Sequence, residues 1–302
     1  MLRVRLLALL SALALWVIAA MPANASSEGH PYLALGDSVS FGFNPHLDPT
    51  KATNFTGYPE IVAQRLNIED VNAACSGEAT GGFISPTGLD NSCRDYRAAF
   101  PLHVSYSGTQ LSFAVDFLKH NPRTRLVTLM LDANDFFRET TGPGTPWPPT
   151  PACFVPPPTG VVGLVTYFST CAVQNLTTIF SAIRGTGYKG LLVVVTYYAL
   201  NYDPRGLSFF VSHDLLNKAM LTAGAPFGIV VAHGFEALQA AAAPFNGDSC
   251  AAGLLLPAFP LGTPGCDVHP TPKGRDLLAG AVIDAIAGTC PAANPIGCLN
   301  RS

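Results

Sequence analysis

Gly36-Asp37-Ser38-Val39-Ser40-Phe41-Gly42 directly follows the apolar run Tyr32–Leu35. A short apolar run that ends at glycine is typical of a buried strand followed by a turn, so Ser38 is expected just beyond the carboxyl end of a strand. In an open parallel sheet the loops at that end surround a crevice in which ligands bind. A serine there can act as a nucleophile if a base reaches it, whereas a lone Gly-Asp-Ser tripeptide is more often only a turn.

Strands and helices alternate along the rest of the chain. Further apolar runs typical of strands are Val71–Ala74, Leu126–Leu131, Leu191–Thr196 and Gly228–Val231. Helical patterns are Tyr58–Leu66, Thr109–His120, Val161–Arg184, Leu215–Thr222, Phe235–Ala243 and Lys273–Ile286. This alternation predicts βαβ units and a parallel sheet covered on both faces. The proline-rich segment Thr141–Pro158 is either an ordered rim or a linker, and Cys153 within it favours a tethered rim.

The chain begins with the features of an export signal. A basic start is followed by the apolar run Leu6–Ala20 and by Ala23-Asn24-Ala25, which is typical of a cleavage site. We therefore expect residues 1–25 to be a secretory signal peptide and residues 26–302 to form a single secreted, extracellular domain. No later segment is apolar for long enough to cross a bilayer, so no transmembrane segment is expected after cleavage.

The charge balance argues against a nucleic-acid-binding protein. The net charge of the whole chain is -3, and loss of Arg3 and Arg5 with the signal peptide leaves 15 basic against 20 acidic residues, or -5. Nucleic-acid-binding domains carry a basic face that neutralises phosphates. We expect a monomer that acts on a small molecule or a lipid.

All eight cysteines follow the expected signal peptide: Cys75, Cys93, Cys153, Cys171, Cys250, Cys266, Cys290 and Cys298. An even number in an exported chain predicts four disulfides, although many connectivities are possible. We expect cysteines that are neighbours in the chain to pair, because each such pair brackets a loop rich in glycine, proline or alanine. A zinc site is the rival interpretation, but the chain has no Cys-x-x-Cys spacing, so no metal is expected.

Four positions combine into a possible site for ester chemistry. Ser38, Gly77 and Asn134 each follow a predicted strand, so they gather at one edge of a parallel sheet. His269 is expected at the start of the last helix, in a loop that can return to that edge. Ester hydrolysis needs a hydroxyl, a base beside it and donors aimed at the oxyanion. Taken singly, these residues are equally typical of turns, a glycine bend and a helix cap.

In this order the motifs resemble those of the GDSL family, also called SGNH hydrolases, which are secreted esterases and lipases. The matching blocks are Gly36-Asp37-Ser38 with Gly42, Asn72 and Ser76-Gly77 with Thr80, Asn134-Asp135, and His269-Pro270 with Gly274. The resemblance implies a three-layer α/β/α, flavodoxin-like fold with a five-stranded parallel sheet. It also implies acyl transfer through a serine ester, with no cofactor.

The resemblance assigns a role to each residue. Ser38 would be the nucleophile and His269 the general base. The backbone N–H groups of Ser38 and Gly77, with the side-chain amide of Asn134, would form the oxyanion hole. We interpret Asp37 and Asp135 as structural residues that hold loops through hydrogen bonds to backbone N–H groups.

The chain departs from the family's pattern at two positions. Asp132 stands where the family usually has glycine, and because a carboxylate facing the oxyanion would oppose its charge, we expect this side chain to point away. Cys266 stands where the family commonly has the aspartate that orients the histidine. Either Asp267 or the backbone carbonyl of Cys266 would then orient His269.

The substrate is predicted from aromatic residues near the motifs, which would line a groove for an acyl chain: Phe41, Phe43, Tyr58, Phe83, Phe136, Phe137 and Trp147. About half of them are equally expected to pack as core. A fatty-acyl ester is the leading substrate. An O-acetylated carbohydrate, acyl transfer to an alcohol, and a non-catalytic binding protein on the same scaffold are the alternatives.

Overall fold

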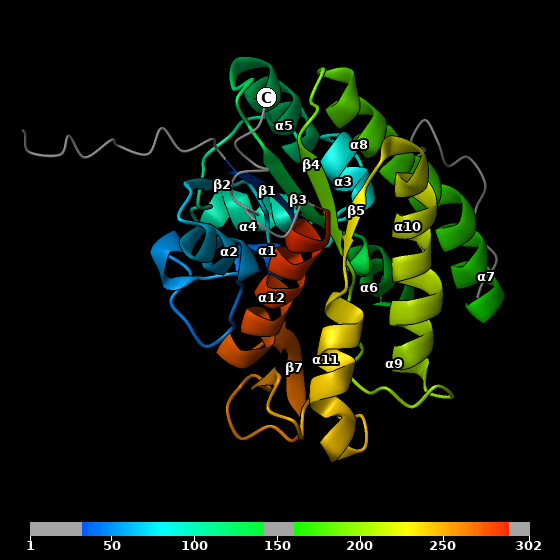
Figure 1. Ribbon diagram of the computed structural model, residues 1–302. Coiled ribbons are helices and arrows are strands. Elements are labelled where there is room, and N and C mark those ends of the chain that lie inside the picture. Colours follow the sequence, from blue (N-terminus) through cyan, green and yellow to red (C-terminus); the bar gives the residue numbers. More distant parts are fainter. Residues whose placement is uncertain (1–31, 142–159, 290–302) are drawn as a thin grey trace, which may run out of the picture.

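The computed structural model describes residues 32–141 and 160–289. The expected signal peptide, almost all of the proline-rich segment with Trp147 and Cys153, and Cys290 and Cys298 lie outside these residues. Five strands form one parallel sheet in the order β2-β1-β3-β4-β5, which confirms the predicted fold class (Figure 1). They are β1 (Tyr32–Gly36), β2 (Asp70–Asn72), β3 (Leu126–Met130), β4 (Leu191–Val195) and β5 (Val230–Ala232).

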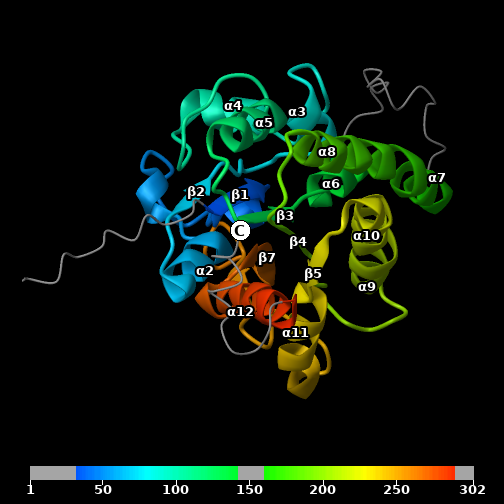
Figure 2. The ribbon, with the colours of Figure 1, turned by 45° about the horizontal axis from the view of Figure 1, so that its top comes forward.

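Helices cover both faces of this sheet, as Figure 2 shows. One layer holds α3 (Thr80–Ile84), α5 (Gln110–His120), α8 (Val173–Gly185) and α10 (Lys218–Gly224). The other holds α2 (Tyr58–Leu66), α11 (Gly234–Ala242) and α12 (Pro272–Thr289). Apolar side chains of the sheet fill the space between the layers, and every residue of β1 and β3 is buried. The near-continuous apolar runs of the sequence are therefore strands buried on both faces.

Local sequence explains where several elements begin. The side chain of Thr109 accepts a hydrogen bond from the Ser112 backbone N–H and caps α5. Pro59 lies in the first turn of α2, where a missing N–H costs nothing. Asp37 caps the short helix α1 (Ser38–Phe41), and Gly42 ends it in the left-handed conformation.

Several predicted elements need correction. The long helix expected over Val161–Arg184 is α7 (Gly160–Tyr167), a π-helical segment (Phe168–Ala172) and α8. The helix expected over Leu215–Thr222 begins earlier, with α9 (Leu207–Phe209) and a second π-helical segment (Phe210–Asn217) before α10. Elements absent from the sequence prediction are α4 (Cys93–Ala99), α6 (Ala133–Thr141), α3 and three short 3-10 turns (52–54, 225–227 and 243–245).

A two-stranded antiparallel hairpin of β6 (Leu255–Pro257) and β7 (Cys266–Pro270) precedes α12. His269 therefore lies in a strand, and the expectation that it opens the last helix is wrong. A disulfide between Cys250 and Cys266, with Cα atoms 5.8 Å apart, ties the start of β7 to the segment before the hairpin.

The strand order places a crevice at the carboxyl ends of β1 and β3. Consecutive crossovers leave these two neighbouring strands in opposite directions along the sheet, which opens a gap between the following loops. Ser38 follows β1 and Asn134 follows β3. The fold thus brings together the two motifs that the sequence analysis placed after these strands.

Candidate active site

Ser38 follows a tight turn that requires glycine at position 36. Gly36 has φ +138°, and a Cβ added there would lie 2.2 Å from the Met130 carbonyl oxygen. Oδ1 of Asp37 accepts the Val39 backbone N–H at 2.9 Å, and its Oδ2 accepts the hydroxyl of Tyr197. Burial raises the pKa of Asp37 to about 6, although these hydrogen bonds oppose the shift.

His269 lies against Ser38 although 231 positions separate them in the chain, with Nε2 2.9 Å from the serine Oγ. The Phe43 ring packs edge-on against the imidazole, with the ring centroids 5.0 Å apart. A histidine nitrogen at this distance can take the proton of a serine hydroxyl.

Asp267 is the group that contacts the other side of His269. Its Oδ1 bonds the imidazole Nδ1 and also accepts the His269 backbone N–H, the latter at 2.9 Å. Burial alone would raise the pKa of Asp267, but the hydrogen bonds and the charge of His269 outweigh burial and lower it. The structure thus places this carboxylate, and not the Cys266 carbonyl, at Nδ1.

Asn134 lies in the first turn of α6 and its amide is fixed by two neighbours. Its Oδ1 accepts a hydrogen bond from Asn91 Nδ2 at 2.9 Å, and its Nδ2 donates to the Glu78 carbonyl at 3.0 Å. An amide nitrogen carries two hydrogens, so one remains to donate to a substrate. Asn91 has no motif in the sequence, and only the folded contact identifies it.

Gly77 lies beside Asn91 and is fixed by the same loop. Its φ is +84°, and an added Cβ would lie 2.1 Å from the Asn91 carbonyl oxygen, so glycine is required. The Gly77 carbonyl accepts the Asn91 backbone N–H at 2.7 Å. A disulfide between Cys75 and Cys93, with Cα atoms 5.7 Å apart, closes this loop. Both disulfides seen within the described residues join cysteines that are neighbours in the chain.

Asp135 connects two motifs. Its carboxylate accepts the Thr80 backbone N–H at 2.9 Å and the Thr80 hydroxyl at 2.6 Å. Tyr167 donates its hydroxyl to the same carboxylate. Asp37 and Asp135 both bind backbone N–H groups, as the structural interpretation requires.

Asp132 is wholly buried and does not line the pocket beside Ser38. Its φ is +105°, a backbone conformation that favours glycine. Neither carboxyl oxygen has a hydrogen-bond partner among the described residues. Burial raises the pKa of Asp132 well above its usual value, and the charges of Asp135 and Asp37 raise it further.

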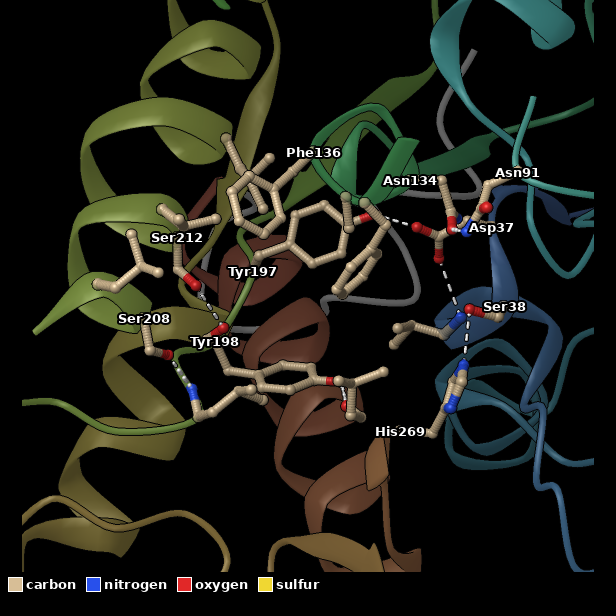
Figure 3. A pocket seen from close by; sticks show the side chains of 18 residues that line it. Asp37, Ser38, Asn91, Asn134, Phe136, Tyr197, Tyr198, Ser208, Ser212 and His269 are labelled. Carbon is tan, nitrogen blue, oxygen red and sulfur yellow. Dashed lines mark hydrogen bonds between the residues drawn. The ribbon is translucent and has the colours of Figure 1, made fainter. Parts of the chain in front are cut away.

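A pocket of about 550 Å³ opens beside Ser38, His269 and Asn134. Figure 3 shows Ser38 and His269 on one side, and Tyr198 with Ser208 and Ser212 on the other. The apolar residues that line it are Val39, Ala133, Phe136, Phe137, Leu200, Leu207, Val211, Leu216 and Val268. The pocket wall thus comes mainly from α6 and from the segment between β4 and α10.

The aromatic residues expected at the pocket have different positions. Only Phe136 and Phe137 line it, whereas Phe41, Tyr58 and Phe83 are fully buried in the core. Phe43 contacts His269 without lining the pocket, and Trp147 lies outside the described residues. Sequence reasoning missed Tyr197 and Tyr198, which follow β4 and line the pocket instead. Tyr198 also donates its hydroxyl to the Val268 carbonyl at 2.6 Å, one residue before the histidine. An aromatic pair directly after an apolar strand was the available signal.

Potential metal ligands come together at one place within residues 32–141 and 160–289, at Cys75, Glu78 and Cys93. Because the two sulfurs form a disulfide, neither offers a thiolate. Across the same ranges, no helix has the length and apolar character needed to span a membrane.

The sequence model of the GDSL-like lipase/acylhydrolase family matches residues 34–277. No curated protein has a sequence that matches the chain. Among solved structures, an alpha/beta hydrolase enzyme from the metagenome of Lake Arreo, Spain, superposes with a TM-score of 0.53 at 15% identity, over 90% of this chain and 97% of that one. At this identity the likeness supports the fold.

Two further solved structures give lower TM-scores. An acetylxylan esterase from Geobacillus stearothermophilus gives 0.47 at 16% identity, over 85% of this chain and 94% of that one. A member of the lipolytic protein G-D-S-L family from Veillonella parvula gives 0.45 at 16% identity, over 84% of this chain and 96% of that one.

Proposed function

Because the chain belongs to the GDSL-like lipase/acylhydrolase family, we propose that it is a secreted serine esterase that hydrolyses fatty-acyl esters through an acyl-enzyme intermediate. The observation that carries this proposal is the chain of contacts from Ser38 Oγ through His269 to the Asp267 carboxylate. Such a chain supplies an activated nucleophile and an oriented base. The features of residues 1–25 and the two disulfides support export.

In the first half of the proposed reaction, Ser38 Oγ attacks the ester carbonyl carbon while its proton passes to His269 Nε2. Asp267 accepts the hydrogen bond from Nδ1 and stabilises the imidazolium. The oxyanion receives hydrogen bonds from the backbone N–H groups of Ser38 and Gly77 and from Asn134 Nδ2. Collapse of the tetrahedral intermediate expels the alcohol, which takes the proton from His269.

In the second half, water replaces the alcohol. His269 removes a proton from the water, which attacks the acyl carbon of the Ser38 ester and releases the carboxylic acid. The same oxyanion donors stabilise the second tetrahedral intermediate. Asp132 does not oppose these steps, because its side chain is buried away from the pocket and its raised pKa favours the neutral acid.

The pocket favours an acyl chain over an acetyl group. Its volume of about 550 Å³ far exceeds what acetyl requires, and most of its wall is apolar. Phe136, Phe137, Leu207 and Val211 can remove an acyl chain from water. A fatty-acyl ester therefore fits better than an O-acetylated carbohydrate.

The test is hydrolysis of p-nitrophenyl esters from acetyl to palmitoyl by the native protein and by Ser38→Ala. We expect activity to rise with chain length, and Ser38→Ala to lower kcat by at least about a thousandfold. Ser40→Ala is the matched control, because Ser40 is buried two residues further along the same helix and outside the pocket. A serine-directed fluorophosphonate should label the native protein and the control, but not Ser38→Ala.

Other outcomes would redirect or overturn the proposal. Activity confined to the acetyl ester would favour an O-acetyl esterase. Acylation of an added alcohol in preference to water would favour an acyltransferase. A folded protein that neither hydrolyses any ester nor reacts with the fluorophosphonate would be a binding protein.

A further inference from the structure

Exposed apolar side chains gather at one end of the molecule. Among the described residues the largely exposed ones are Leu47, Val161, Val162, Val165, Leu200, Leu207, Phe245, Phe259 and Leu261. The three valines belong to α7, at the side of the molecule, whereas the others lie in the loops after β1 and β4, at the start of α9, after α11 and in the β6–β7 hairpin, at the end where the carboxyl ends of the strands open (Figure 1). An exposed apolar surface concentrated in this way indicates an interaction site.

Two of these side chains belong to the pocket itself. Leu200 and Leu207 line it, yet 40% and 64% of their surfaces are exposed. The apolar wall of the pocket therefore extends onto the outer surface at these two side chains.

A second group lies on the β6–β7 hairpin, which also carries His269. Phe259 and Leu261 are 60% and 72% exposed on the hairpin whose strand β7 carries His269. The ring of Phe259 packs on His46, and His46 Nε2 bonds the Pro257 carbonyl at 2.9 Å. Leu47, next to His46, is 39% exposed. We call Leu47, Leu200, Leu207, Phe259 and Leu261 the apolar rim.

The rim carries little net charge and is firmly held. Residues 249–266 contain no charged side chain, and the Cys250–Cys266 disulfide closes this segment. The charged residues near the other rim positions are three acids and two bases, which leaves no excess of positive charge to attract an anionic surface: Asp48, Asp203, Asp248, Lys51 and Arg205. A fixed apolar surface without excess positive charge fits an uncharged lipid surface better than an anionic one.

We propose that the apolar rim docks the pocket onto the surface of an uncharged lipid aggregate, from which the enzyme withdraws its ester substrate. This proposal rests on the proposed fatty-acyl esterase function. A second copy of the chain, or another protein seated on the rim, would close the entrance beside Leu200 and Leu207. A lipid surface contacts the rim and also supplies the acyl chain that fills the apolar pocket.

Binding is tested without turnover, so that its failure can be distinguished from failure of the esterase proposal. Ser38→Ala in the full chain is mixed with vesicles of ether-linked phosphatidylcholine, and the vesicles are sedimented. We expect most of the protein to sediment with them, and 0.5 M NaCl to leave this fraction unchanged, because apolar burial is not screened by salt. Protein that stays in the supernatant would overturn the proposal, whatever the esterase assays show.

Rim variants test where the contact lies. Phe259→Ser with Leu261→Ser, and separately Leu207→Ser, should each weaken partition into the vesicles at least tenfold. Val162→Ser is the matched control, since Val162 is 68% exposed on α7 and is not part of the apolar rim. A further test uses the protein with Ser38 intact. There, Phe259→Ser with Leu261→Ser should hydrolyse dissolved p-nitrophenyl butyrate at the native rate, but emulsified long-chain ester at least tenfold more slowly than the native protein does.

Three results would contradict docking through the rim. The first is partition of the rim variants equal to that of the Val162→Ser control. The second is binding that requires anionic lipid and disappears in 0.5 M NaCl, which would indicate an electrostatic surface. The third is a native dimer in light scattering that Phe259→Ser with Leu261→Ser converts to monomers, which would make the rim an interface between copies.

Discussion

Replacing Asp132 with glycine is expected to stabilise the protein by about 1 to 3 kcal/mol at pH 7.5. The native residue holds φ at +105°, which costs a non-glycine residue about 1 to 2 kcal/mol. Its two carboxyl oxygens are buried without a hydrogen-bond partner among the described residues, at a cost of about 1 to 3 kcal/mol. Glycine removes both costs. Against this, glycine lowers the free energy of unfolding by about 0.5 to 1 kcal/mol because the unfolded chain gains conformational freedom. The lost packing of the side chain lowers it by a similar amount.

The pH dependence separates the carboxyl group from the backbone. Burial raises the pKa of Asp132 in the folded protein, so the folded state keeps a proton that the unfolded state releases near pH 4. The stability from this group is fully present below about pH 4 and is lost as pH rises toward the folded-state pKa. The advantage of Asp132→Gly should therefore be larger at pH 7.5 than at pH 4.5, where only the backbone and hydrogen-bond costs remain.

The assay is urea unfolding of the native protein, Asp132→Gly and Asp132→Asn at both pH values. A stabilisation of 1 to 3 kcal/mol corresponds to a rise in Tm of about 2 to 10 °C for a domain of this size. Asp132→Asn keeps the side chain at positive φ but does not titrate, so it should lose the part of the pH dependence that comes from Asp132 and gain less stability than glycine. Ester hydrolysis should stay within about threefold of native, because Asp132 is outside the pocket. A glycine variant that is less stable at pH 7.5, or whose advantage does not change with pH, would refute this reasoning.

Three further predictions concern residues around the pocket. Asn91→Ala should lower kcat about tenfold with little change in KM, because one hydrogen bond that orients Asn134 is lost; adding it to Asn134→Ala should cost nothing more, and additive losses would exclude a positioning role. Asp267→Asn should lower kcat by roughly 10² to 10⁴ with the fold intact, and near-native turnover would show that another group orients His269. Burial, with the charge of Asp90 second, raises the pKa of Glu78 to about 8, so stability should fall by about 1.4 kcal/mol per pH unit as pH rises from about 5 to 8. Urea unfolding of Glu78→Gln should show a pH slope that is shallower than that of the native protein by this amount, and an equal slope in both proteins would rule out Glu78 as a source.

Long apolar runs made the sheet predictable from sequence. The runs at Leu126–Leu131 and Leu191–Thr196 appear as β3 and β4, because only strands buried on both faces have no need to alternate with polar residues. The helices α3 and α4 were not predictable in the same way. They are short and rich in glycine or polar residues, and their position depends on the Cys75–Cys93 disulfide and on contacts with distant segments.

The group that orients His269 shows why spacing alone was insufficient. With His269 expected at a helix start, a spacing of two did not decide between Asp267 and the Cys266 carbonyl as the group that orients the imidazole. In the observed strand β7, residues two apart lie on the same face, which brings Asp267 to Nδ1. Strand β7 forms by pairing with β6, and no local sequence pattern predicts this pairing.

The segment after β4 connects the parts of the site that the sequence shows separately. Tyr197 donates its hydroxyl to Asp37, which caps the helix that begins at Ser38. Tyr198 donates to the Val268 carbonyl, next to His269. Both tyrosines also line the pocket. Two residues from the middle of the chain therefore bind the loops at its opposite ends, and the wall that would hold the acyl chain also fixes the distance between Ser38 and His269.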